Sequence, residues 1–230
     1  MEKPSYKDFC FAGNGSFDLA SLPTNLQLPE NCEKKIIKEM AKNVKKIAKL
    51  QDKLYADRRE GMVVLVQAMD AAGKDGTVKH VFSGVNPQGV EVTSFKTPSK
   101  EELSHDYLWR AVKALPARGK IGVFNRSYYE DVLVVKVHEM QRGYTMAPRN
   151  IDQDTKEFFE QRYRQIKDFE RYLDENSYRV VKVFLNVSRE EQHARFLSRI
   201  DTQKKNWKFS AGDLAESDLW PQYMDAYQQV

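Results

Sequence analysis

Four short apolar runs, rich in β-branched residues, recur along the 230-residue chain. They cover residues 62–69, 90–95, 121–124 and 180–187. Runs of this length and composition are typical of strands that are buried on both faces of a parallel sheet. The stretches between them have helical patterns, at about 77–84, 100–114, 152–175 and 189–200. Strands that alternate with helices in this way predict a doubly wound α/β fold with a parallel sheet.

A long helix is predicted ahead of the first run, from Asn31, which is suited to cap it, to about Asp57. Its apolar residues are three to four positions apart, at Ile36, Ile37, Met40, Val44, Ile47, Leu50 and Leu54. We expect this stripe to pack on the domain or to contact another subunit.

Two further segments have the composition of irregular structure. Residues 1–30 mix Gly, Pro, Ser and Asn, which predicts an irregular N-terminal arm ahead of a single domain at 31–230. Residues 141–150 contain Gly and Pro and predict a loop near the functional site.

Composition narrows the class of protein. Hydrophobic residues make up 41% of the chain and charged residues 30%, which is the balance of a folded globular protein. Cys10 and Cys32 lie outside any CxxC pattern, which argues against a disulfide framework or a zinc site and favours a reducing cytoplasm. No apolar run approaches the ~18–20 residues that span a bilayer. The N-terminus lacks the apolar core of a signal peptide.

The most informative stretch directly follows the first apolar run and opens a helical pattern: Asp70, Ala71, Ala72, Gly73, Lys74, Asp75, Gly76 and Thr77. Small residues let backbone N–H groups wrap phosphate oxygens, and the following helix adds its N-terminal donors. Lys74 would add a point charge between two phosphoryl groups. The match to G-x-x-x-x-G-K-[ST] is imperfect, because Ala68 and Asp75 replace the first Gly and the Ser or Thr. The alternative is a tight turn with a chance lysine.

Asp70 stands where ligands bind in open α/β sheets, at the carboxyl end of a strand. A carboxylate there would hold Mg²⁺ or orient an acceptor oxygen, and its alternative role is to cap a turn. A second strand ends at Asn125 and Arg126. Arg126 is placed to neutralise a phosphate, and Glu130 to supply a carboxylate. Tyr129 is a candidate for contact with a nucleotide base or phosphate, with core packing as the equal alternative.

Five strings in order, DAAGKDGT, NPQGVEV, FNRSYYEDVLV, VSREEQHARFLSRI and NWKFSAGDL, resemble the polyphosphate kinase 2 family over residues 35–228. The resemblance implies a P-loop kinase-like three-layer α/β/α fold with a helical lid at about 189–212. It implies transfer of the terminal phosphoryl group of polyphosphate to a nucleotide, with Mg²⁺ or Mn²⁺. It also implies a homo-oligomer, with neither nucleic acid nor a membrane as a partner.

The same resemblance assigns roles to individual residues. Asp70, Lys74 and Arg126 match the family's catalytic positions, and Arg199 matches an arginine of the lid. The family often has Asp-Arg where this chain has Asn125 and Arg126, which moves the expected metal ligands to Asp70 and Glu130. The form NRSYYED resembles the subgroup that acts on both AMP and ADP, giving ADP and ATP; guanine nucleotides stay open.

A polyphosphate donor requires a basic track, because each internal phosphate carries about one negative charge. Candidates lie between the two motifs and after the predicted lid helix, and they are Arg110, Lys113, Arg118, Lys120, Lys204, Lys205 and Lys208. The alternative for each is an ordinary solvated surface charge.

Two other functions remain open at this stage. An ATP-dependent nucleoside monophosphate kinase would be expected to have Ser or Thr at Asp75. A non-catalytic module that binds polyphosphate or nucleic acid is permitted by the basic stretches with aromatic residues, and would show binding without turnover. Asp70, Glu130 and Asp131 disfavour it, since carboxylates repel a bare polyanion.

We expect Lys74→Ala to abolish nearly all phosphoryl transfer while the fold persists. Removal of one charge that stabilises a transferring group commonly costs several kcal/mol, a loss on the order of a hundredfold or more in rate. The measurement is steady-state transfer by a variant whose circular dichroism matches the parent. Most of the activity surviving in such a folded variant contradicts the assignment.

Overall fold

The computed structural model describes residues 6–13, 15–26, 32–208 and 212–230. Its centre is a four-stranded sheet in the order β2-β3-β1-β4 in which every neighbouring pair is parallel. The strands are β1 (Gly61–Gln67), β2 (Val90–Ser94), β3 (Ile121–Asn125) and β4 (Tyr178–Phe184). The predicted parallel α/β fold is confirmed, and each expected strand forms with its ends shifted by up to three residues.

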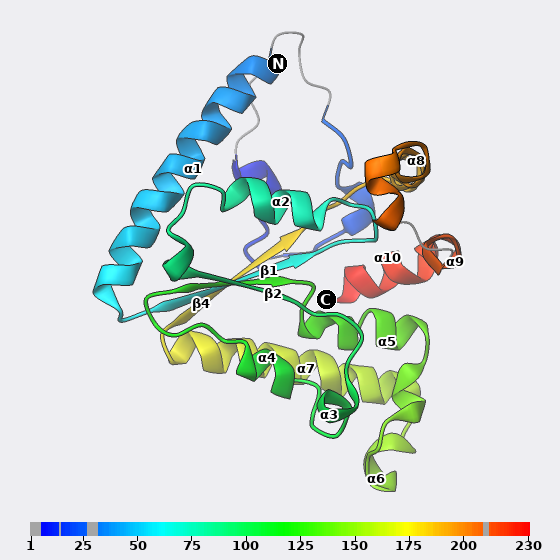
Figure 1. Cartoon of the computed structure of the whole chain (residues 1–230). Helices are drawn as coiled ribbons and strands as arrows, with labels where there is room; N and C mark the ends of the chain where they lie inside the picture. The colour runs from blue at the N-terminus through cyan, green and yellow to red at the C-terminus, as the bar shows by residue number, and fades with distance from the viewer. Residues whose placement is uncertain (1–5, 14, 27–31, 209–211) are drawn as a thin grey trace.

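Helices cover both faces of the sheet and make three layers (Figure 1). On one face lie α1 (Cys32–Asp57) and α2 (Lys74–Val81), and on the other α4 (Trp109–Lys113) and α7 (Thr155–Glu175). Helices α8 (Arg189–Asp201), α9 (Gly212–Asp218) and α10 (Trp220–Gln229) gather beyond the carboxyl ends of the strands. This end of the sheet is therefore the one at which a site is enclosed.

The remaining elements are short. They are α3 (Lys100–Leu103), α5 (Val134–Val137), α6 (Pro148–Ile151), η1 (Tyr6–Phe9), η2 (Leu19–Ser21), η3 (Pro87–Gly89), η4 (Tyr128–Asp131), η5 (Met140–Gly143) and η6 (Gln203–Lys208), where η marks a 3₁₀ helix.

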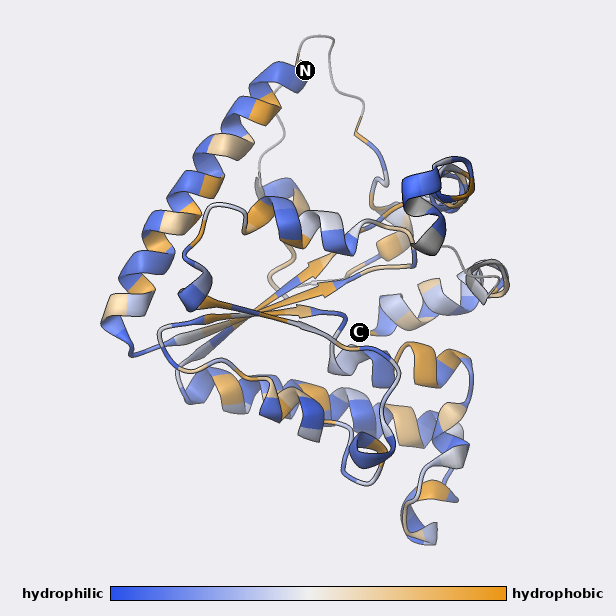
Figure 2. Cartoon of the chain, in the orientation of Figure 1, coloured by the Kyte–Doolittle hydropathy of each residue, from blue (hydrophilic) through white to orange (hydrophobic). Residues whose placement is uncertain are grey.

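Alternation along β1 explains why the sheet is buried on both sides. Val63 and Leu65 face the core shared with α4, α7 and α10, whereas Val64 and Val66 face the smaller core under α2. Successive strand residues point to opposite faces, so a continuous apolar run fits only between two layers. Figure 2 shows the resulting apolar colour along the central strands.

The prediction of one helix over 100–114 is wrong in one respect, because this segment forms two short helices, α3 and α4. The Asp106 carboxylate accepts the backbone N–H of Leu108 at 2.9 Å and so stabilises a turn in place of a continuing helix. The loop predicted over 141–150 also contains two short helical turns, η5 and α6, with residues 144–146 between them.

The N-terminal arm packs on the domain. Leu19 is buried in the larger core, and its backbone N–H donates to Gln228 Oε1 at 2.7 Å. The arm contains η1 and η2, and Asn31, the expected helix cap, lies outside the described residues.

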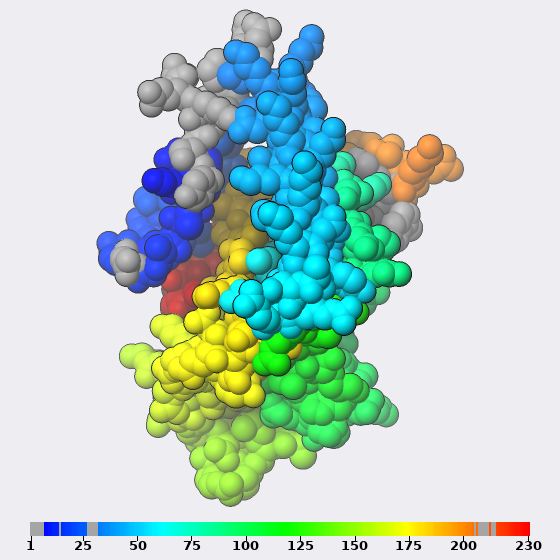
Figure 3. Space-filling model, turned by 90° about the vertical axis from the view of Figure 1, so that its left-hand side faces the viewer, coloured from blue at the N-terminus to red at the C-terminus, as the bar shows by residue number. Residues whose placement is uncertain are grey.

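Helix α1 lies on the outside of the molecule along most of its length (Figure 3). Ile37, Met40 and Leu50, from the predicted apolar stripe, are exposed, and Gln51 is the helix's one fully buried residue among those described. The apolar stripe of α1 is therefore only partly buried against the rest of this chain. In the part of the chain that the structure describes, no helix combines the length and apolarity needed to cross a bilayer.

We expect Gln51→Met to raise the free energy of unfolding by about 1 kcal/mol, because a buried amide without hydrogen-bond partners is destabilising. Gln51 is 1% exposed, and neither its Nε2 nor its Oε1 has a partner among the described residues. Methionine keeps the length of the side chain without the amide. Urea unfolding measures the change; a lower free energy of unfolding contradicts this account.

Candidate active site

The phosphate loop turns sharply between the end of β1 and the start of α2. Ala71 has φ of 60° and Gly73 has φ of 100°, both in the left-handed region. That region costs a non-glycine residue energy, so Ala71 is held there by its surroundings. The loop, the edge of the sheet and α8 border a cavity of about 300 Å³, which is lined by Asp70, Ala71, Gly73, Lys74, Asp75, Gly76, Ser94, Phe95, Lys96, Asn125, Arg126 and Arg199.

Lys74 reaches this cavity from the first residue of α2. Its Nζ donates to the carbonyls of Ala68 and Met69 at 2.8 and 3.0 Å and lies 3.9 Å from Asp70 Oδ1. Its side chain is 10% exposed. Burial, helped by the nearby Arg126 charge, lowers the pKa of Lys74 from 10.5 to about 8, against the opposing effect of Asp70. An anion in the cavity would favour the charged ammonium and raise the pKa of Lys74 again.

Arg126 joins the two motifs. It directly follows β3 with φ of 62°, a strained conformation that its backbone N–H bond to the Val66 carbonyl at 3.1 Å helps to hold. Its Nη2 donates to Asp70 Oδ1 at 2.5 Å and its Nη1 to Glu130 Oε2 at 3.2 Å. Burial opposes the charge, but Glu130 and Asp70 outweigh it and raise the pKa of Arg126. The guanidinium therefore stands between two carboxylates.

Asn125 has a structural reason to be an amide. Its Nδ2 donates to Asp75 Oδ1 at 2.7 Å across the mouth of the phosphate loop. An aspartate at position 125 would place two carboxylates at hydrogen-bond distance, which is unfavourable without a cation between them. The amide of Asn125 is thus complementary to the carboxylate of Asp75.

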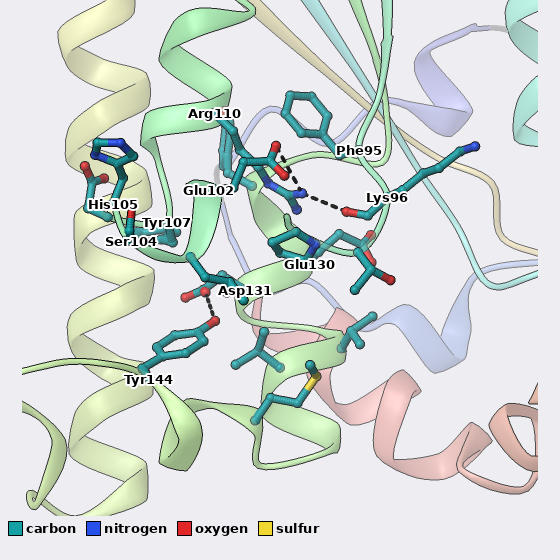
Figure 4. A pocket seen from close by; sticks show the side chains of 18 of the residues that line it. Phe95, Lys96, Glu102, Ser104, His105, Tyr107, Arg110, Glu130, Asp131 and Tyr144 are labelled. Atoms are coloured by element: carbon teal, nitrogen blue, oxygen red, sulfur yellow. Dashed lines mark hydrogen bonds and ion pairs between the residues drawn. The ribbon is translucent and has the colours of Figure 1, made fainter. Parts of the chain in front are cut away.

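A second and larger cavity, of about 760 Å³, adjoins the first (Figure 4). Phe95, Lys96 and Arg126 line both cavities and mark where they meet. Its other lining residues come from α3 and the segments beside it, from α4, η4 and α5, from η5 and the loop after it, and from α7. They are Thr97, Pro98, Glu102, Leu103, Ser104, His105, Asp106, Tyr107, Arg110, Tyr128, Glu130, Asp131, Val134, Val135, Met140, Tyr144, Thr145, Met146 and Arg162.

A buried ionic cluster lies at the wall of the larger cavity. Arg162 Nε and Asp131 Oδ2 are 3.0 Å apart, as an ion pair that is not aligned as a hydrogen bond. Tyr144 OH donates to Asp131 Oδ1 at 2.5 Å, a contact drawn in Figure 4. Burial raises the pKa of Asp131, and Arg162 opposes that rise.

Tyr107 also lines the larger cavity, and its ring lies under the guanidinium of Arg162, 4.2 Å from ring centroid to Cζ. Its buried hydroxyl has no hydrogen-bond partner among the described residues. A buried hydroxyl is usually paired, so Tyr107 is an exception among the buried polar groups next to this cavity.

Other predicted site residues are not brought to either cavity. Ala72 and Thr77 are absent from both linings, although they belong to the loop and to the first turn of α2. Tyr129 is buried, and its hydroxyl donates to Glu170 of α7 at 2.8 Å. Tyr129 therefore packs and anchors η4, which is the alternative role that the sequence left open.

The predicted polyphosphate track is dispersed. Arg118 precedes β3 and so lies at the amino edge of the sheet, where its Nη2 donates to the Asn176 carbonyl at 3.0 Å. In a parallel sheet that edge is opposite the phosphate loop, so Arg118 does not belong with the site. Lys204 is exposed in η6 after α8, and the side chains of Lys205 and Lys208 lie outside what the structure describes.

Sequence reasoning missed Lys96 and Tyr107. Lys96 follows the end of β2, and the rule that ligands bind at the carboxyl ends of parallel strands was the available signal. Tyr107 lies in the turn that replaced the predicted continuous helix, so no sequence signal pointed to it.

A divalent ion at this site would be held mainly by the substrate. Within the described ranges, no three or more His, Cys, Asp or Glu residues form a group able to hold a metal. Asp70 and Asp75 line the smaller cavity with hard oxygen donors. Mg²⁺ in phosphoryl-transfer sites commonly takes one or two carboxylates plus phosphate oxygens, so the residues present fit such an ion.

A parallel sheet with a phosphate loop after β1, an arginine after β3 and an arginine from α8 at the same cavity defines a P-loop phosphotransferase. In a scan against known families, residues 30–230 match polyphosphate kinase 2. The chain belongs to the polyphosphate kinase 2 family.

Individual relatives agree with this assignment. The chain is 47% identical over 223 residues to the ADP-polyphosphate phosphotransferase of Rhodopseudomonas palustris, covering 97% of this chain and 77% of that protein. It is 40% identical over 216 residues to the AMP/ADP-polyphosphate phosphotransferase of Meiothermus ruber, covering 94% and 76%. The crystal structure of polyphosphate kinase 2 from Arthrobacter aurescens TC1 superposes with a TM-score of 0.82 at 41% identity, covering 95% of this chain and 74% of that one.

We expect polyphosphate binding to take up a proton at alkaline pH and to weaken above about pH 8. Above that pH the free protein holds Lys74 mostly neutral, whereas the bound polyanion favours the ammonium. Calorimetric titration with tripolyphosphate near pH 9, in two buffers that differ in ionisation enthalpy, measures the proton uptake.

The matched control is Lys74→Met, which lacks the titrating group and should take up no proton on binding. Equal uptake by the parent and by Lys74→Met contradicts the assignment of the proton to this lysine.

Proposed function

We propose that the protein transfers the terminal phosphoryl group of inorganic polyphosphate to AMP and to ADP, forming ADP and ATP. The observation that carries the proposal is the pair of adjoining cavities that meet at Lys96 and Arg126. The substrates named for the relatives from Rhodopseudomonas palustris and Meiothermus ruber support the same reaction.

The smaller cavity suits a donor made only of phosphates. Four cationic side chains line it, against the two carboxylates Asp70 and Asp75, and they are Lys74, Lys96, Arg126 and Arg199. Its volume of about 300 Å³ and its single aromatic residue, Phe95, offer little to a nucleoside. These features favour polyphosphate over ATP as the donor.

The larger cavity suits the acceptor nucleotide. Its 760 Å³ falls in the range of pockets for ligands of nucleotide size, roughly 300–1,000 Å³. Tyr107, Tyr128 and Tyr144 supply flat apolar surface for a base. An acceptor placed here directs its phosphates toward Arg126, where the donor ends. The lining of this cavity determines the preference between adenine and guanine. AMP and ADP are the acceptors that we propose.

The reaction follows from these positions. A phosphate oxygen of the acceptor attacks the terminal phosphorus of the donor, a new P–O bond forms, and the bond to the rest of the polyphosphate chain breaks. The attacking oxygen is already ionised at neutral pH, so no strong base is required. Lys74, Arg126 and Arg199 neutralise charge on the transferring group and on the leaving chain.

Asp70 orients this arrangement through Arg126 and would hold Mg²⁺ or Mn²⁺. We assign the second metal position to Glu130, with Asp75 as the alternative that lines the same cavity as Asp70. When bound, the ion would supply positive charge to the phosphate oxygens. Asp70→Asn should weaken activation by Mg²⁺; an unchanged requirement for the ion contradicts the assignment.

We also propose a homo-oligomer in which exposed Ile37 and Met40 of α1 contact another subunit. Light scattering of the purified protein tests it, and a strict monomer refutes it. We place the reaction in the cytoplasm, where nucleotides are available and the exposed thiol of Cys10 would stay reduced; cell fractionation tests this location.

One assay tests the reaction. The protein is incubated with AMP, long-chain polyphosphate and Mg²⁺, and AMP, ADP and ATP are resolved over time; a parallel sample receives ATP in place of polyphosphate. The proposal expects ADP and then ATP from polyphosphate. Transfer only from ATP identifies a nucleoside monophosphate kinase, and binding without products identifies a non-catalytic module.

We expect Tyr107→Phe to raise the KM for AMP about three- to tenfold and to leave the KM for polyphosphate unchanged, the size expected for loss of one hydrogen bond. The physical reason is that Tyr107 lines the larger cavity and that its buried hydroxyl lacks a hydrogen-bond partner among the described residues until an acceptor binds. Tyr163→Phe is the control, because Tyr163 lines neither cavity and bonds to Lys136 and Gln229. Equal effects of the two substitutions contradict the acceptor assignment.

A further inference from the structure

Helix α8 does more than carry Arg199 to the smaller cavity. Gln192 Nε2 donates to the carbonyl of Asp70 at 2.9 Å. Arg195 Nη1 donates to the carbonyls of Ala71 and Ala72 at 3.2 and 2.7 Å. Three consecutive carbonyls of the phosphate loop therefore point to donors on one helix.

This pattern fixes the direction of the loop's amides. None of the described peptide bonds is cis, and in a trans peptide the C=O of one residue and the N–H of the next point in opposite directions. With the carbonyls of Asp70 and Ala72 directed at α8, the N–H groups of Ala71 and Gly73 point away from that helix. Amides in that direction are the donors that a phosphate loop requires.

The loop also needs support because it is strained. Ala71 has φ of 60°, a conformation that costs a residue with a Cβ on the order of 1–3 kcal/mol and persists only where its surroundings impose it. Its carbonyl is bound by Arg195, and the carbonyl before it by Gln192. The hydrogen bonds from α8 thus hold both peptides that flank this residue.

Gln192 is the buried member of this contact. It is 1% exposed, and both ends of its amide are used, since its Oε1 accepts the Ser217 hydroxyl of α9 at 3.0 Å. The Asp70 carbonyl can only accept, so it selects the Nε2 end of Gln192, and the Ser217 hydroxyl holds the Oε1 end. Arg195 is partly exposed and is also bound by Glu191 at 2.7 Å.

We propose that Gln192 is a positioning residue for the donor-phosphate loop. It holds the peptide after Asp70 so that the Ala71 amide and the Asp70 carboxylate both serve the smaller cavity. Ser217 of α9 holds Gln192 in turn. The proposal rests on the proposed function only in taking the smaller cavity as the donor site.

The test compares two buried glutamines. Gln192→Met removes both hydrogen bonds at nearly constant length, and Gln51→Met is the matched control, since Gln51 is equally buried, belongs to α1 and lines neither cavity. We expect Gln192→Met to raise the KM for polyphosphate about tenfold with the KM for the nucleotide unchanged, and Gln51→Met to change neither. Loss of roughly two neutral hydrogen bonds is of that size.

A second pair of variants covers the case in which Gln192→Met does not fold. Gln192→Glu keeps the acceptor for Ser217 but, when ionised, has no donor for the Asp70 carbonyl, so it should also raise the KM for polyphosphate. Ser217→Ala keeps the donor and removes only the orienting bond, so its effect should be about two- to threefold.

Direct binding separates this proposal from the proposed function. Tripolyphosphate should bind each Gln192 variant more weakly than the parent in calorimetry. Unchanged binding and unchanged KM overturn the positioning role, whether in folded Gln192→Met or in Gln192→Glu at a pH at which the new carboxyl is ionised. An equal rise in both KM values also overturns it. A parent protein that binds tripolyphosphate but transfers nothing overturns the proposed function and leaves the positioning of the loop intact.

Discussion

The guanidinium of Arg126 is the contact on which the rest of the site depends. It bonds Asp70 of the phosphate loop on one side and Glu130 of η4 on the other, and it borders both cavities. Four cations around a small cavity would repel one another in the free protein. The carboxylates between these cations stabilise the site when no substrate is bound. The cations remain available to bind a polyanion.

That contact requires the turn after β3 to be rigid, and two buried clusters make it so. Tyr128 and Tyr129 both donate to Glu170 of α7, which Lys182 of β4 also contacts at 2.9 Å. Asp131, at the end of the same turn, is paired with Arg162 of α7. The turn is thus held to α7 by three side chains, Tyr128 and Tyr129 before Glu130 and Asp131 after it. The strained φ of Arg126 is tolerated because its neighbours leave the turn no alternative.

The parts of the site that could be predicted from the sequence are those with local signals. Asp70, Gly73 and Lys74 follow a strand and open a helix, and this order is enough to predict a phosphate loop. Arg126 follows a second buried strand. The family resemblance added Arg199, and the structure brings it to the same cavity as Lys74. Two placements had no local signal: Tyr129, for which nucleotide contact and core packing were both open, packs on α7, and Arg118 lies at the far edge of the sheet.

The sequence by itself determined the alternation of strands and helices, the phosphate loop and the family, since each depends on residues close together in the chain. Only the tertiary structure decided which side chains meet. Lys96 and Tyr107 join Arg126, and Gln192 meets the Asp70 carbonyl from 122 positions away. The physical reason is that no local pattern encodes strand order or helix packing. Strand order brings the carboxyl ends of distant strands to one edge of the sheet, and helix packing directs the donors of α8 toward that edge.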